Sequence, residues 1–100
     1  MNAWSYVAAR LEHQVVRFHF IVTELDLAIT FSDIALTAAT DKKAQRNTGH
    51  ARLAYDSAMR FLEGAQMTTK MRQSIDERVK RVEQMLRKLD RRSGKAAEGS

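Results

Sequence analysis

The first forty residues carry an apolar side chain at every third or fourth position, and no proline interrupts the chain. This spacing is typical of one helical face, because an α-helix turns once in about 3.6 residues. Two shorter runs with the same spacing follow. The pattern therefore predicts three helices that each offer an apolar face to a shared core. The first face comprises Val7, Leu11, Val15, Phe18, Val22, Leu25 and Ile29.

The two later runs differ in the size of their side chains. The second run is rich in alanine, which lets neighbouring helix backbones approach closely, and Tyr55 fills the gap between them. It comprises Ala44, Thr48, Ala51, Tyr55, Ala58, Leu62 and Ala65. The third run has larger aliphatic side chains and comprises Met71, Ile75, Val79, Val82, Leu86 and Leu89.

The first helix is expected to begin at Asn2 or Ser5, since either side chain can accept a hydrogen bond from the first turn. A second apolar row continues the helical pattern to about Thr40. The helix would then be about 55 Å long at 1.5 Å per residue. The alternative is a break near Thr23 to Asp26, which would give four helices instead of three.

The second helix is expected to begin between Asp41 and Asn47, both of which are suitable caps. Gly49 lowers helix stability by about 1 kcal/mol relative to alanine, which favours a place near a helix end. Gly64 suits the left-handed residue that follows a helix C-terminus. The sequence therefore predicts that the second helix ends just before Gly64.

Thr68 or Thr69 is expected to cap the third helix, which would run to Arg92 and stop before Gly94. Residues 1–93 then form a single helical bundle domain, and residues 94–100 form a disordered tail. Short connections favour antiparallel neighbours. We therefore expect an all-α fold, an up-down-up three-helix bundle with a long first helix.

The composition fits a soluble protein, with 44% hydrophobic and 29% charged residues in a chain of 100. The absence of cysteine excludes disulfides, thiolate metal sites and cysteine nucleophiles. No secretory signal pattern follows Met1, and no apolar passage reaches the roughly 20 residues that span a bilayer. We expect a cytoplasmic protein without a membrane span.

Candidate catalytic chemistry is sparse. His13 and His19 point in different directions on a helix, and the spacing of neither residue fits a metal motif. The serines are not part of a Gly-x-Ser-x-Gly turn, and glycine is too scarce for a phosphate-binding loop. We therefore expect no enzymatic activity, no cofactor and no metal site.

The positive charge of the chain is concentrated in its last third. Residues 1–41 contain two basic and five acidic residues, whereas residues 68–95 contain ten basic and four acidic ones. Basic residues on the third helix could neutralise the phosphates of a nucleic acid. The alternative function is therefore nucleic-acid association, with candidate contacts at Arg78, Arg81, Lys88 and Arg92.

The acids of the third helix favour a solvated face over a nucleic-acid site. Three of the four precede a base by four residues, a spacing that stabilises a helix by a few tenths of a kcal/mol. No aromatic residue lies among the bases to stack on a nucleobase. The expected pairs are Asp76 with Lys80, Glu77 with Arg81, and Glu83 with Arg87.

The alternation of small and aromatic residues in the second helix resembles the second helix of a tetratricopeptide repeat. It is also similar to the middle helix of the MIT (microtubule-interacting and trafficking) domain, and Arg81 and Glu83 resemble the end of the third MIT helix. The similarity covers Leu25 to Leu89, without the tryptophan, the Leu-Gly pair and the proline of the repeat. It implies a groove beside the second and third helices that receives a partner helix. The second-helix residues that carry the resemblance are Ala51, Tyr55, Ala58 and Leu62.

The first helix is longer than its two neighbours can cover, so its N-terminal half is left without a partner in a monomer. Exposed apolar strips of that extent usually mark an interface. We therefore expect a non-catalytic protein–protein interaction module that self-associates, as a symmetric homodimer. The expected interface residues are Trp4, Val7, Leu11, Val15, Phe18 and Val22.

Overall fold

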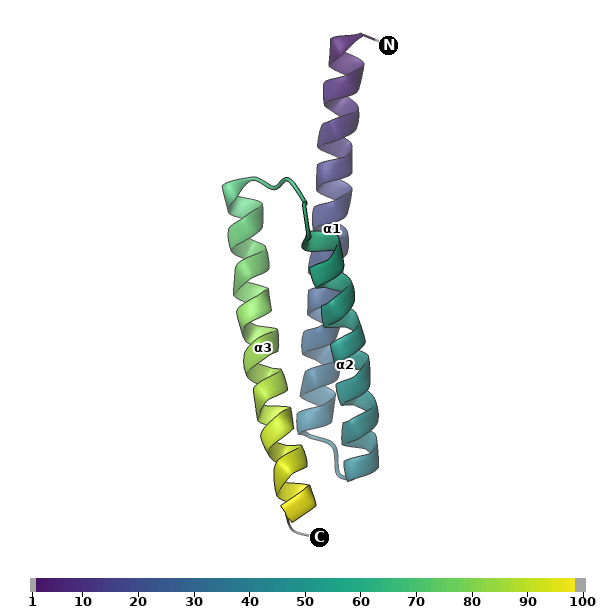
Figure 1. The fold of residues 1–100 in the computed structure, drawn as a ribbon. Coiled ribbons are helices and arrows are strands. Elements are labelled where there is room, and N and C mark those ends of the chain that lie inside the picture. Colours follow the sequence, from purple (N-terminus) through teal and green to yellow (C-terminus); the bar gives the residue numbers. More distant parts are fainter. Residues whose placement is uncertain (1, 99–100) are drawn as a thin grey trace.

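The computed structural model describes residues 2–98, which form three α-helices (Figure 1). These are α1 (Ala3–Leu36), α2 (Asp41–Leu62) and α3 (Thr69–Glu98). α1 and α3 run in one direction and α2 runs in the other (Figure 1). The structure therefore confirms the all-α, up-down-up bundle with a long first helix.

α1 is continuous over 34 residues, about 51 Å at 1.5 Å per residue. The expected alternative, a break near Thr23 to Asp26, is therefore wrong. The helix ends earlier than expected, at Leu36 instead of near Thr40. Thr40 has an extended backbone because it caps α2, and an extended residue cannot continue a helix.

α1 is the central helix of the bundle. α2 and α3 each pack along its C-terminal half and contact each other much less, while its N-terminal half projects beyond both (Figure 1). The molecule is consequently elongated, with extents of 66 × 20 × 18 Å. None of the three helices, as far as residues 2–98 describe them, has the length and apolar composition that a bilayer crossing requires.

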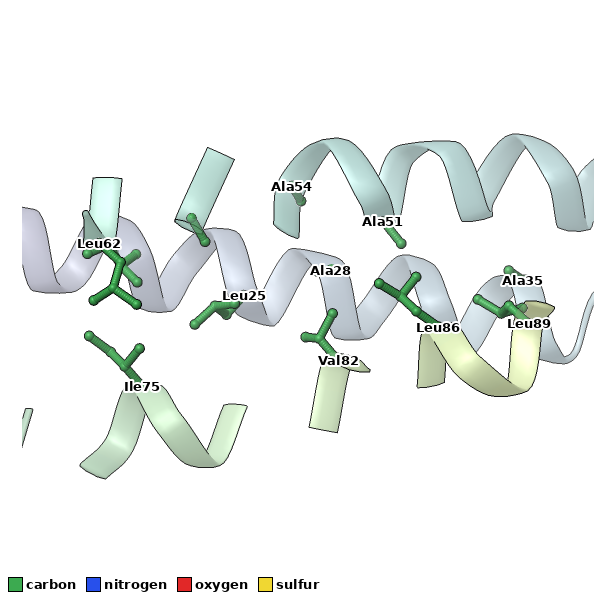
Figure 2. Close-up of a cluster of buried hydrophobic side chains, with 12 residues drawn as sticks. Leu25, Ala28, Ala35, Ala51, Ala54, Leu62, Ile75, Val82, Leu86 and Leu89 are labelled. Atoms are coloured by element: carbon green, nitrogen blue, oxygen red, sulfur yellow. The ribbon is translucent and has the colours of Figure 1, made fainter. Parts of the chain in front are cut away.

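Alanines form the contact between α1 and α2. Ala28 of α1 and Ala51 of α2 are fully buried, with Ala54 nearly so (Figure 2). Ala58 of α2 is fully buried as well. Small side chains bring the two backbones close together, as the sequence predicted. The buried face of α2 differs slightly from the predicted one. Asn47 and Ala54 are buried, while their neighbours Thr48 and Tyr55, which were predicted on that face, are only half-buried.

α3 contributes large aliphatic side chains to the same core. Ile75, Val82 and Leu86 point towards α1 (Figure 2). The helix continues to Glu98, which corrects the expected end at Arg92 and the expected tail from residue 94. Gly94 has no positive φ, and lysine, alanine and glutamate, which follow it, favour helix. Residues 99–100 of that expected tail lie outside the described residues.

Local side chains cap the three helix starts. The Asn2 Oδ1 atom accepts a hydrogen bond from the Ser5 amide at 2.8 Å. Thr40, not Asp41 or Asn47, caps α2 by accepting from Lys43 at 3.2 Å. Thr68 caps α3 in the same way. These caps place the helix starts within the ranges that the sequence predicted, or one residue before them.

Glycine has two different roles around α2. Gly64 follows the helix with φ +71, the left-handed conformation that the sequence predicted there. Gly49 instead lies inside α2, away from either end. A Cβ atom at Gly49 would meet nothing within 4 Å, so nothing in the structure explains this glycine.

Candidate interaction surface

The N-terminal half of α1 has no helix packed against it. α2 ends at Leu62, and the left-handed turn at Gly64 redirects the chain away from the axis of α2 and towards α3 (Figure 1). As a result, nearly every side chain from Ala3 to Arg17 is exposed to solvent. The end of α2 at Leu62 and the turn that follows thus leave this part of α1 uncovered.

The six expected interface residues lie along one line of α1, which we call the N-terminal stripe: Trp4, Val7, Leu11, Val15, Phe18 and Val22. They fall within a sector of about 80°, since each residue of a helix advances by about 100°. Trp4 is 80% exposed and Leu11 56% exposed, and Val7 and Val15 are exposed as well. Phe18 and Val22 are half-buried against the core. The structure therefore divides the expected interface into four free residues and two that belong to the bundle.

The N-terminal stripe lies on the same side of α1 as α3. Arg78 of α3 donates a hydrogen bond to Asp26 of α1 at 3.0 Å, close to Val22 along the stripe. Since both helices rise about 1.5 Å per residue in one direction, Thr69 lies near the level of Arg17. The free part of the stripe thus lies just beyond the first residue of α3, and it continues the line along which α3 packs.

A groove of about 810 Å³ lies at the corner between α1, the end of α2 and the following loop. Three aromatic rings line it, and the Phe20 and Phe61 ring centroids are 4.4 Å apart. Its charged lining residues are both arginines, and no carboxylate is among the lining side chains. The lining residues are Tyr6, Val7, Arg10, Leu11, His13, Gln14, Val16, Arg17, Phe20, Phe61, Gly64 and Gln66.

Two hydrogen bonds attach the α2–α3 loop to the projecting part of α1. The Arg10 guanidinium donates to the Gln66 side chain, and the Gln14 side-chain amide donates to the Gln66 carbonyl, each at 2.6 Å. The Arg10 guanidinium also lies 5.9 Å from the Tyr6 ring centroid. The groove was not among the sites predicted from the sequence. The second apolar row of α1, together with Gly64, is the feature of the sequence that points to it.

Two of the four candidate nucleic-acid contacts are engaged inside the bundle. Arg78 pairs with Asp26. Arg92 donates hydrogen bonds of 2.7–3.1 Å to three carbonyl oxygens around the C-terminus of α1, and it lies 3.8 Å from Asp41. Its side chain is only 28% exposed. These two arginines attach α3 to α1, a role that the sequence did not indicate.

The other two candidates, Arg81 and Lys88, are exposed. Together with three further bases they occupy the outer side of α3, within a sector of about 120° at about 100° per residue. We call these five residues the outer cationic face of α3. Its members are Lys80, Arg81, Arg87, Lys88 and Arg91.

Acidic residues of α3 have partners other than the expected ones. Asp76 lies 3.5 Å from Arg72, which is one turn before it, whereas the expected partner Lys80 is one turn after it. Glu83 accepts a hydrogen bond from the Tyr55 hydroxyl at 3.3 Å, which connects α2 to α3. Burial raises the pKa of Tyr55, and the Glu83 carboxylate adds to the shift. These contacts draw Asp76 and Glu83 towards neighbours outside the outer cationic face, whereas the exposed Glu77 lies within its sector.

The residues that carry the family resemblance lie mainly inside the bundle. Ala51, Ala58 and Leu62 are buried in the core, and Tyr55 reaches from α2 to α3. A smaller hollow of about 300 Å³ lies between the start of α2 and the end of α3. Most of its lining residues are polar or charged, and Arg52 and Asp90 form an ion pair there.

The clearest features of the described residues are contact surfaces. Within residues 2–98, no three His, Cys, Asp or Glu side chains come together as metal ligands. His13 lines the groove, while His19 and His50 lie beside the rings of Phe18 and Phe31. Comparison of the chain with protein-family models, curated protein sequences and solved structures gives no match.

Proposed function

We propose that this chain is a non-catalytic helical interaction module that self-associates as a dimer through the N-terminal half of α1. The supporting observation is the free part of the N-terminal stripe. Trp4 alone leaves roughly 120–200 Å² exposed, because an aromatic side chain covers about 150–250 Å². With Val7, Leu11 and Val15 beside it, the stripe reaches the few hundred Å² that mark interaction sites.

A second copy is the partner that best fits this stripe. The charged residues of the projecting segment are Arg10, Glu12 and Arg17, and all three lie outside the 80° sector of the stripe. The contact line from Trp4 to Val15 is therefore apolar along about three helical turns, and no charged residue lies on it. A twofold axis presents the same apolar line from both copies, which makes the interface self-complementary.

The position of α3 favours an antiparallel pair. In a parallel pair, the partner's α1 would run down the α3 side and meet α3 from the level of Arg17. In an antiparallel pair, the N-terminus of the partner's α1 lies near that level. The rest of the partner's bundle then lies beyond the N-terminus of the first copy. The register that avoids α3 places Trp4 of one copy opposite Val15 of the other, with the axis between Val7 and Leu11.

Sedimentation equilibrium of matched variants tests the proposal. Leu11→Glu and Val15→Glu place a charge on the stripe, and we expect each variant to be monomeric where the unaltered chain is dimeric. Leu53→Glu is the control, because Leu53 is 70% exposed on α2, away from the stripe. Dimers that persist in both stripe variants, or that are equally lost in the control, would contradict an interface on the stripe.

The outer cationic face of α3 supports a second candidate function, binding to nucleic acid. Its five bases share one side of the helix. Glu83, which was expected to pair with Arg87 of this face, interacts with Tyr55. Phosphate contacts of this kind weaken steeply as salt rises. We expect Arg81→Glu with Lys88→Glu to abolish binding to a DNA duplex, and Arg60→Glu on α2 to leave it unchanged. Binding that does not respond to salt would remove this candidate.

A further inference from the structure

We propose that the groove at the end of α2 binds an amphipathic helix with acidic flanks, supplied by a partner protein. This site is separate from self-association, although Val7 and Leu11 lie at its edge. The groove follows α1 from Tyr6 to Phe20, which is about 21 Å at 1.5 Å per residue. A partner helix of about four turns matches that length.

The shape of the groove follows from the course of the chain. Phe61 closes the groove at the end of α2, and Gly64 then turns the chain aside with φ +71. The space along α1 beyond Phe61, towards the N-terminus of α1, is the place that α2 would occupy if it continued. A helix from a partner can therefore lie on α1 along the line that α2 follows, beside the loop that Gln66 attaches to Arg10 and Gln14.

The lining has the side-chain types that contribute most to protein interfaces. Tyrosine and arginine are enriched among residues that dominate binding energy, and Tyr6 and Arg10 already lie together here. Phe20 and Phe61 form an aromatic pair at the closed end. Rigid rings bury much area for few torsions, so this end can anchor an aliphatic side chain of the partner.

The charge of the lining identifies the partner as acidic. Arg10 and Arg17 border the groove, and none of its lining residues is a carboxylate. Arg10 uses one guanidinium nitrogen on Gln66, whose side chain is neutral. Carboxylates that flank the apolar side of a partner helix would therefore meet positive charge along the α1 wall, which favours both encounter and orientation.

Fluorescence polarisation with two labelled peptides tests this proposal. The first is a 16-residue amphipathic helix with leucines on one side and glutamates on its flanks, and the second has lysine in place of every glutamate. We expect saturable binding of the acidic peptide and at least about tenfold weaker binding of the basic one. Failure of the acidic peptide to bind at concentrations up to about 1 mM would overturn the proposal.

Variants of the full chain locate the binding site. We expect Arg17→Glu to weaken the acidic peptide at least about tenfold and Arg17→Lys to weaken it less than about threefold. Arg81→Glu, on the outer cationic face of α3, is the control for overall charge and should have no effect. Equal losses in Arg17→Glu and Arg81→Glu, or no loss in Arg17→Glu, would overturn the assignment.

The stripe variant Val15→Glu separates this inference from self-association, because Val15 does not line the groove. We expect it to bind the acidic peptide as tightly as the unaltered chain does. If the dimeric unaltered chain does not bind the peptide and the monomeric Val15→Glu variant does, then a second copy fills the groove and the proposed partner is wrong. A DNA duplex that displaces the peptide and loses affinity in Arg17→Glu would likewise replace the partner helix with a nucleic acid.

Discussion

Cysteine cross-linking tests the antiparallel pairing of α1 with unusual clarity, because the chain contains no cysteine of its own. We consider two single variants, Trp4→Cys and Val15→Cys, each oxidised alone and then as an equimolar mixture. We expect cross-linked dimers in the mixture and almost none in either variant alone. In the proposed register, residue 4 of one copy faces residue 15 of the other, so only the mixture brings two cysteines together.

The expected contrast follows from helix geometry. In the antiparallel register, identical residues at position 4 are separated by eleven residues along the axis, about 17 Å at 1.5 Å per residue. The same separation applies to two copies of position 15. A disulfide requires Cα atoms roughly 4.4–6.8 Å apart, so neither single variant can form one across the interface. Helix axes about 8–10 Å apart bring facing Cα atoms at one level close to that range.

Non-reducing electrophoresis after oxidation with a glutathione buffer gives the result directly. Cross-linking of Trp4→Cys alone, as efficient as in the mixture, would refute the antiparallel arrangement and indicate a parallel pair. The molar mass of each reduced variant is measured alongside. A dimer with the parallel pattern would leave self-association intact, whereas monomers throughout would contradict the interface itself.

Three further predictions concern the bundle. Ser32 is fully buried, and its hydroxyl oxygen has no hydrogen-bond partner among the described residues, so Ser32→Ala should raise the free energy of unfolding by about 1 kcal/mol in urea titrations. Arg92→Ala removes charged hydrogen bonds at the end of α1 and should lower that free energy by about 2 kcal/mol; an unchanged midpoint would contradict the role of this arginine. In a Tyr6→Phe background, ultraviolet absorbance should show that Glu83→Gln lowers the pKa of Tyr55. Because folding raises the pKa of Tyr55, the contribution of this residue to the free energy of unfolding is complete below about pH 10 and is lost as the pH rises through its pKa in the folded state. Glu83→Gln should reduce that loss of stability.

The sequence predicted those features that depend on near neighbours in the chain. Asn2 and Thr68 cap helices because each side chain reaches an amide three residues ahead. Gly64 ends α2 because its backbone adopts a left-handed conformation that other residues rarely adopt. The apolar period likewise predicted the continuous stripe of α1, since helical geometry alone determines which residues share a side.

Features that depend on distant segments were not predictable in the same way. In the sequence, nothing distinguishes Arg92 from the other basic residues of the third helix. Only the packing of α3 against α1 brings its guanidinium to the end of α1. Asn47 is buried because α2 is rotated slightly from the expected face, and a rotation of one position changes which side chains meet the core. The groove also escaped prediction, because its walls come from residues about fifty positions apart, such as Arg10 and Gln66.

The molar mass of the unaltered chain in solution tests self-association most directly. Light scattering across a dilution series should give twice the 11.4 kDa of one chain at micromolar concentration and fall towards 11.4 kDa on dilution. A constant mass of one chain at every concentration would contradict self-association, because the apolar side chains from Trp4 to Val15 would then remain exposed without a second copy.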